Sequence, residues 1–280
     1  MKPRNIILTG VPRSGTTLCC SLLGQAPDTV ALFEPMPVHE LPVQHAAAVS
    51  AIRDFFAASR ASLLESGTAT SQQVDGRVPD NPFGSDVGTD GLRIRTAQLG
   101  DIRVEKALSG EFSLVIKHNA AFTALLPALV REFECYAVVR NPLAVLASWN
   151  SVDLPVTGGR LPAGERLDPE LATRLDAEPD VLERQLHLLD WLFSRFYRHL
   201  SAERIVRYEQ VVATAGQALA SATGVGVPLL ALHSRNASRL YDADACRRYA
   251  ERLHRHEGPW RRFYGSDDVA SALDVLQGET

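Results

Sequence analysis

The sequence has few cysteines and no long hydrophobic run. Its 280 residues include four cysteines, two of them adjacent at Cys19 and Cys20. That spacing fits neither a disulfide framework nor a set of zinc ligands, and it favours a reducing compartment. No stretch reaches the roughly 18 apolar residues of a membrane span, and the apolar run after Asn5 is too short for a secretory leader. The sequence therefore predicts a cytoplasmic protein without a membrane span.

The chain also lacks a large excess of charge of either sign. It has 29 lysines and arginines against 33 aspartates and glutamates, a formal net charge of -4. This balance argues against general binding to nucleic acid or to membrane surfaces, so an anion site would have to be local. With 45% hydrophobic residues the chain can bury a full core, and we expect a single domain over residues 1–280. The composition indicates no oligomeric state.

Short runs of strand-forming residues alternate with helical patterns along the chain. The predicted strands are Asn5–Thr9, Thr29–Phe33, Phe112–Ile116, Cys135–Val139 and Arg204–Arg207. The predicted helices are Thr16–Gln25, His45–Glu65, Phe122–Phe133, Pro142–Asn150, Pro179–Leu200, Glu209–Ala222 and Ala243–His256. This alternation predicts an α/β fold with a P-loop-type parallel sheet of about five strands flanked by helices. The Gly- and Ser-rich stretch Ser66–Gly91 predicts a flexible exposed loop, and Asp153–Asp180 is expected on the substrate side.

Polar residues follow the carboxyl ends of the predicted strands. They are Gly10–Thr17, Glu34, Lys117, Arg140 and Tyr208. Ligands of open parallel sheets bind at that edge, so five such groups indicate a binding site there. Polar residues also cap strand ends in proteins without a ligand, so each position taken singly is ambiguous.

The segment Gly10–Thr17 predicts a tight loop between a strand and a helix. Its backbone N–H groups and the positive end of the helix form a nest for a phosphate, and Gly15 allows the backbone to approach closely. The spacing from Gly10 to Gly15 matches a Walker A loop, but Thr16 stands where that loop has its lysine. The cation lies instead inside the loop, at Arg13. A standard ATP or GTP hydrolase is therefore disfavoured.

A second anion site is predicted around Arg140, at the end of another strand. Asn141 and Pro142 form an N-cap and N1 pair for a new helix, and Ser148 follows Arg140 by eight residues. An arginine fork and a serine hydroxyl on a helix suit a dianionic phosphate.

Both segments resemble motifs of sulfotransferases that use 3′-phosphoadenosine 5′-phosphosulfate. The run Pro12-Arg13-Ser14-Gly15-Thr16-Thr17 resembles the 5′-phosphosulfate loop of the tyrosylprotein and carbohydrate branches, where arginine can replace the lysine of the cytosolic branch. The run from Val139 to Ser148 resembles the motif whose arginine and serine bind the 3′-phosphate. The resemblance implies this donor as co-substrate, no metal, and sulfuryl transfer to an acceptor.

Other positions of the resemblance are less complete. The implied nucleotide-binding residues further along the chain are Tyr208 near the adenine, Arg252 and Arg255 at the 3′-phosphate, and Trp260 and Arg261 in a Gly-x-Trp-(Lys/Arg) segment. The two arginines at 252 and 255 fit a solvated helix face equally well. Leu18 stands where the cytosolic branch has a tryptophan, and the late Arg-Lys-Gly triplet of that branch is absent.

The resemblance also implies catalytic roles. Leu32-Phe33-Glu34-Pro35 resembles the Phe-Glu-Pro run of carbohydrate sulfotransferases, which makes Glu34 the general base, with a pKa that burial would raise. Glu34 could instead be a solvated strand end or a partner of Arg13. The resemblance implies that Lys117 is a second cation that contacts the sulfuryl group. His118 is the alternative base, although it stands one place earlier than the histidine of the cytosolic branch.

The acceptor is the least constrained partner. We expect a hydroxyl of a carbohydrate, a phenol or tyrosine, or a small metabolite, with an amine also open, and no nucleic acid. The residues predicted to contact it are His39, His45, Trp149 and Asp153. A P-loop nucleotide or metabolite kinase and a non-catalytic nucleotide-binding module are the alternatives. The kinase needs Mg²⁺ ligands and a loop lysine, and the sequence offers neither in the expected position.

Overall fold

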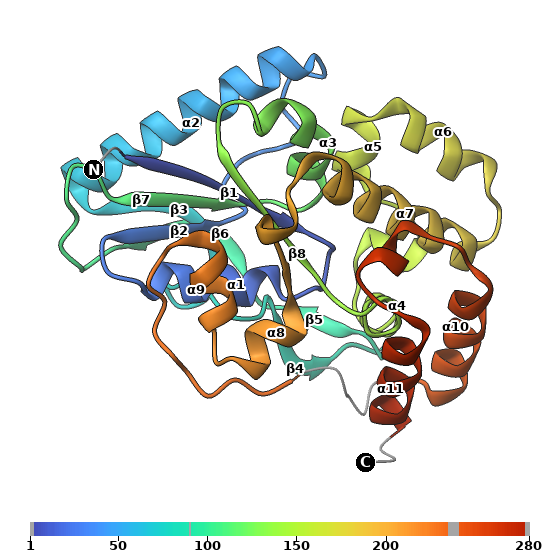
Figure 1. The fold of residues 1–280 in the computed structure, drawn as a ribbon. Coiled ribbons are helices and arrows are strands. Elements are labelled where there is room, and N and C mark those ends of the chain that lie inside the picture. The colour runs from blue at the N-terminus through green and yellow to red at the C-terminus, as the bar shows by residue number, and fades with distance from the viewer. Residues whose placement is uncertain (1–2, 90, 235–240, 278–280) are drawn as a thin grey trace.

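The computed structural model describes residues 3–89, 91–234 and 241–277, and a five-stranded sheet lies at its centre (Figure 1). The strand order is β2-β7-β1-β8-β9, and every neighbouring pair is parallel. The strands are β1 Arg4–Gly10, β2 Thr29–Phe33, β7 Ser113–Lys117, β8 Glu134–Val139 and β9 Ile205–Arg207. The predicted α/β fold with about five parallel strands is confirmed.

Helices cover both faces of this sheet (Figure 1). Ile6 and Leu8 of β1 join the apolar cluster under α1, α8 and α9, whereas Ile7 joins the larger cluster under α2, α3 and α7. Burial on both faces explains why the strands read as continuous apolar runs. The bounds are α1 Thr16–Gln25, α2 His45–Ser66, α3 Ala120–Leu129, α7 Val181–His199, α8 Tyr208–Ala213 and α9 Gln217–Thr223.

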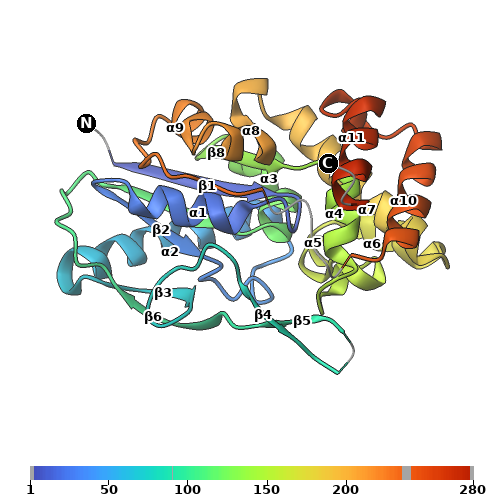
Figure 2. The ribbon, with the colours of Figure 1, turned by 90° about the horizontal axis from the view of Figure 1, so that it is seen from below.

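A second group of helices surrounds α4, the helix that follows β8 in the chain. Its long C-terminal members, α10 and α11, pack against α4 (Figures 1 and 2), and all residues of α4 are buried. None of the helices in the described ranges is long and apolar enough to cross a membrane. The remaining helical bounds are α4 Pro142–Trp149, α5 Pro162–Leu167, α6 Pro169–Ala177, α10 Ala243–Arg255, α11 Ser266–Gln277, and the 3₁₀ turns η1 Pro155–Gly158, η2 Ala202–Arg204 and η3 Pro259–Arg262.

The segment Ser66–Gly91 is not a loop throughout, contrary to the sequence-based expectation. β3 (Thr68–Gln73) pairs with β6 (Gln98–Arg103), and β4 (Phe83–Val87) pairs with β5 (Arg93–Arg95), both antiparallel (Figure 2). These pairs lie outside the central sheet, and most of their described residues are partly or fully exposed. Because many residues of these strands are polar, the sequence does not show the alternation of apolar and polar residues that predicts a strand.

Two predicted helices have different limits in the structure. The helix predicted over Glu209–Ala222 is divided into α8 and α9, because Ala215 and Gly216 adopt positive φ angles of 52° and 94°. The helix α3 contains Pro127 and ends at Leu129, short of the predicted end. The expected substrate segment, residues 153–180, is largely helical and contains η1, α5 and α6.

Candidate functional site

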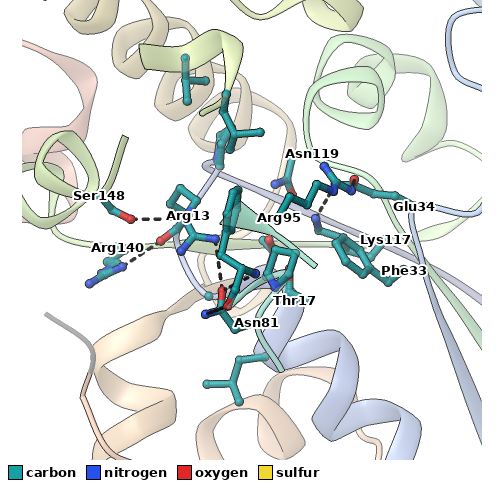
Figure 3. Close-up of a pocket in the computed structure, with 18 of the residues that line it drawn as sticks. Arg13, Thr17, Phe33, Glu34, Asn81, Arg95, Lys117, Asn119, Arg140 and Ser148 are labelled. Carbon is teal, nitrogen blue, oxygen red and sulfur yellow. Dashed lines mark hydrogen bonds and ion pairs between the residues drawn. The ribbon is translucent and has the colours of Figure 1, made fainter. Parts of the chain in front are cut away.

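A cavity of about 440 Å³ lies where the five parallel strands end (Figure 3). Its lining takes residues from the carboxyl end of each strand or from the segment that follows it: the loop after β1, Glu34, Lys117, Arg140 and Tyr208. Its volume is within the range of small-molecule sites. The structure therefore brings the five predicted strand-end groups to one place. In the described parts of the chain, no three His, Cys, Asp or Glu side chains cluster as metal ligands would.

The loop between β1 and α1 presents the start of α1 to this cavity. Gly15 is the N-cap, with a φ of 87°, and among the described residues no side chain caps the helix. A Cβ at Gly15 would lie 2.4 Å from Cδ2 of Tyr208, so the position requires glycine. The first-turn N–H groups of α1 have no intrahelical acceptor and suit an anion. Pro12, Thr16 and Thr17 also line the cavity.

Ser14 does not line the cavity, contrary to its predicted contact with the phosphate. Its hydroxyl is fully buried and donates a hydrogen bond of 2.8 Å to the carbonyl of Val138. Its backbone N–H donates to the carbonyl of Val11 at 3.0 Å. Ser14 therefore fastens the loop to β8.

Arg13 joins the two predicted phosphate motifs. Its Nε donates to Oγ of Ser148 at 3.2 Å, and its guanidinium lies 4.6 Å from the ring centre of Phe83. Arg140, which is only 5% exposed, donates from Nη1 to the carbonyl of Arg13 at 2.9 Å and lies 4.9 Å from the ring centre of Tyr208. Figure 3 shows Arg13 between Arg140 and Ser148 on one side and Lys117 and Glu34 on the other.

Glu34 forms ion pairs at the other side of Arg13. Nζ of Lys117 donates to its Oε1 at 2.7 Å, and Nη2 of Arg95 lies 3.6 Å from its Oε2 (Figure 3). Burial raises the pKa of this carboxyl, but Lys117, His118 and Arg95 outweigh that effect and lower the pKa of Glu34 to about 2. The expected upward shift is therefore wrong for this arrangement, and the cations paired with Glu34 are Lys117 and Arg95.

His118 lines the cavity but is poorly suited to act as a base. The residue is 5% exposed, and its Nε2 accepts a hydrogen bond of 3.2 Å from the backbone N–H of Met36. Burial lowers the pKa of the His118 imidazole to about 4. The neutral ring therefore carries its proton on Nδ1, and its remaining lone pair is already engaged.

We expect His118 to make the stability of the fold depend on acid pH. Its folded pKa lies below the unfolded value, so its contribution is complete above about pH 6.5 and is lost as pH falls toward 4. Between pH 7 and pH 4.5 the free energy of unfolding should fall by roughly 2 kcal/mol more in the wild type than in His118→Asn, because asparagine does not titrate. Urea unfolding at both pH values measures this.

The matched control for His118→Asn is His39→Asn, because His39 is a surface histidine. This variant should retain the pH dependence of the wild type. Equal losses of stability in the wild type and His118→Asn would show that His118 is not the titrating group.

Several residues of the lining were not predicted, and they include five with polar or aromatic side chains. These five are Asn81, Phe83, Arg93, Arg95 and Asn119. Asn81 accepts a hydrogen bond of 3.4 Å from Nη1 of Arg13, and four of the five come from β4, β5 or the approach to β4. The alternation Arg93-Ile94-Arg95 is a strand pattern that places two arginines on one face. Asn119 directly follows the predicted Lys117-His118 pair.

Comparisons with known proteins give little guidance. No family model matches the sequence, and no curated protein matches it either. Among solved structures, the chain is similar to the sulfotransferase STF1 from Mycobacterium tuberculosis H37Rv, with 14% sequence identity and a TM-score of 0.35. The match covers 99% of this chain and 78% of that chain. A TM-score this low carries no argument about family or activity, so the function rests on the cavity itself.

The predicted nucleotide-binding residues of the C-terminal helices lie away from this cavity. Arg252 forms a fork with Glu183 of α7, with distances of 2.5 and 2.7 Å, and Arg261 donates to backbone carbonyls at the end of α10. Trp260 is 1% exposed and belongs to the core. Arg255 borders a separate cavity of about 270 Å³ between α10 and α11. Arg252, Trp260 and Arg261 are thus engaged in joining and packing helices, whereas Arg255 is exposed.

The four residues predicted to contact the acceptor do not line the cavity either. His39 and Asp153 are exposed on the surface. Nε2 of His45 lies 2.9 Å from the backbone carbonyl at the end of α5. Trp149 is fully buried, and its Nε1 donates to the carbonyl of Pro12 at 2.8 Å. Trp149 therefore holds the loop between β1 and α1 in place.

Proposed function

We propose that this protein is a sulfotransferase that moves a sulfuryl group from 3′-phosphoadenosine 5′-phosphosulfate to an acceptor hydroxyl. The observation that carries the proposal is the shared cavity of the Arg13 loop and Arg140, which lie 127 residues apart in sequence. A donor with a phosphosulfate at one end of the ribose and a phosphate at the other matches two adjacent cationic sites. The order and residues of the two sulfotransferase-like motifs support the same conclusion.

The residues at the loop fit such a donor. The uncapped start of α1 and the guanidinium of Arg13 suit the 5′-phosphosulfate, and the hydroxyls of Thr16 and Thr17 line the same part of the cavity. Arg140 and Ser148 suit the 3′-phosphate. A kinase of the P-loop type would need its lysine at the position of Thr16.

The proposed reaction needs a proton acceptor and a cation at the leaving oxygen. The acceptor oxygen forms a bond to sulfur, the bond from sulfur to the 5′-phosphate oxygen breaks, and 3′-phosphoadenosine 5′-phosphate is released. Arg13 and Lys117 stabilise the charge on the departing oxygen, and Glu34 receives the acceptor proton. Turning Lys117 from Glu34 to the sulfuryl group removes the nearest cation from Glu34 and raises the pKa of this carboxylate.

Calorimetric titration with 3′-phosphoadenosine 5′-phosphate and with ATP, each with and without Mg²⁺, tests the proposal. We expect one site for the bisphosphate with an affinity that Mg²⁺ does not change, because cations of the protein neutralise both phosphate groups. ATP should bind more weakly under both conditions. Preference for ATP that depends on Mg²⁺ would instead indicate a kinase.

A further inference from the structure

One wall of the cavity is apolar and lies next to the proposed reaction centre. We call it the acceptor wall, and it consists of Leu154, Pro155, Val156, Leu161, Pro162 and Ala163 from η1, α5 and their flanks. Helix α5 packs against α3, and α3 begins immediately after Asn119. The α5 part of the acceptor wall therefore lies near the start of α3, which directly follows Lys117, His118 and Asn119 in the chain.

The charged side chains around this end of the cavity are already engaged with other protein groups. Lys117 and Arg95 pair with Glu34, and Nη2 of Arg93 donates to Oγ of Ser151 at 2.9 Å. Nε2 of His118 accepts a hydrogen bond from the backbone N–H of Met36. If the substrate carried many hydroxyl groups, several of these hydroxyl groups would lie against the acceptor wall without a hydrogen-bond partner. Each unpaired hydroxyl lowers affinity roughly five- to hundredfold.

Asn119 supplies one unused hydrogen-bond acceptor in the same place. Its Oδ1 is buried and has no hydrogen-bond partner among the described residues, although Asn119 lines the cavity. The backbone of Asn119 is fixed, because its carbonyl accepts from Oγ1 of Thr9 at 2.9 Å and from the N–H of Thr123 at 3.0 Å. Buried side-chain oxygens are rarely left without a donor in proteins. This oxygen is closed to solvent in the structure, so a hydroxyl in the cavity would supply the missing donor after the Asn119 side chain turns toward the cavity.

We infer that the acceptor is a predominantly apolar alcohol or phenol whose hydroxyl donates to Oδ1 of Asn119. The inference rests on the sulfuryl transfer proposed above. While Lys117 is hydrogen-bonded to Glu34, Oδ1 of Asn119 is the group that accepts the hydrogen bond from the substrate hydroxyl. When Lys117 turns to the sulfuryl group, the hydroxyl oxygen bonds to sulfur, the sulfur bond to the phosphate oxygen breaks, and the proton passes to Glu34. Asn119 is thus a positioning residue that also selects the acceptor.

Binding to the full-length protein loaded with 3′-phosphoadenosine 5′-phosphate tests this inference, with 2-naphthol, naphthalene and lactose as probes. We expect 2-naphthol to bind and lactose to give no heat. Naphthalene should bind roughly tenfold more weakly than 2-naphthol, because it cannot donate to Asn119. With the sulfated donor present, 2-naphthol should be sulfated and lactose should not.

The variant Asn119→Leu isolates the proposed hydrogen bond. It should bind 2-naphthol and naphthalene equally while retaining the wild-type affinity for the bisphosphate, which also verifies its fold. Asn119→Asp, which keeps an acceptor oxygen, should restore the preference for 2-naphthol.

The possible failures are distinguishable. Failure of the wild type to bind the bisphosphate would overturn the proposed function and this inference with it. Binding of the bisphosphate together with preference for lactose would overturn the apolar acceptor alone. Equal binding of 2-naphthol and naphthalene by the wild type would overturn the role of Asn119.

Discussion

Replacing Arg140 with alanine should weaken binding of 3′-phosphoadenosine 5′-phosphate at least roughly 100-fold. Arg140 is almost fully buried at the edge of the cavity, where a charge-assisted hydrogen bond is stronger than on the surface. Each bond to a charged group contributes about 1.5–3 kcal/mol, and a guanidinium can donate two such bonds to a phosphate. Calorimetry with the bisphosphate measures the loss.

Two controls separate the proposed phosphate contact from other effects of Arg140→Ala. Arg198→Ala removes the same charge from an exposed position on α7 and should leave the affinity unchanged. Adenosine 5′-phosphosulfate lacks the 3′-phosphate, so Arg140→Ala should bind it nearly as well as the wild type does. If both nucleotides lose affinity equally, Arg140 acts only by holding the loop carbonyl of Arg13.

The Glu34→Gln variant should lose most turnover while binding the bisphosphate normally. A general base contributes roughly 10²–10⁴-fold to a rate, and glutamine cannot receive the proton. Glutamine retains an oxygen that can accept from Lys117, so the lysine stays close to its position. Steady-state sulfation of 2-naphthol measures kcat, and calorimetry measures the affinity. Asp153→Asn, at an exposed position outside the cavity, is the matched control.

The pH dependence of the wild type gives a second measure of the role of Glu34. The carboxylate must be ionised to accept a proton, so activity falls when pH drops through its pKa. With a pKa of about 2 in the free protein, kcat/KM should show no acid limb from Glu34 above about pH 4. If Lys117 turns to the donor, kcat should show such a limb at higher pH. Undiminished kcat in Glu34→Gln would place proton removal elsewhere.

The sequence predicted the location of the cavity because parallel strands place their carboxyl ends together. The strand-end residues Glu34, Lys117 and Arg140 could therefore be associated without coordinates. Pairing of Lys117 with Glu34 could not, because it depends on the register that sets Phe33 beside Lys117 in neighbouring strands. That register is fixed by packing on both faces of the sheet.

The site residues that were predicted wrongly or missed share one physical cause. Their environment is set by contacts with residues far away in the sequence. Arg252 carries the charge expected of a phosphate ligand, but Glu183 on another helix neutralises it. The ring of Trp149 packs in the core, and its Nε1 donates to the carbonyl of Pro12 in the loop. Arg95 was missed because it lies on β5, a strand of three residues whose pairing with β4 is not visible in the local pattern. Helix and strand patterns describe local preference and leave these partners undetermined.

The bond from Arg140 to the carbonyl of Arg13 and the bond from Trp149 to the carbonyl of Pro12 tie the loop to the two ends of α4. Both supports come from buried side chains, so the separation of the two cationic sites is nearly fixed before any ligand arrives. A rigid spacing favours ligands whose two anionic groups already lie at the matching distance, because little ordering entropy is lost. The proposed nucleotide would then be recognised more by the geometry of its phosphates than by its base, so the residue at Leu18 could vary with little effect on binding.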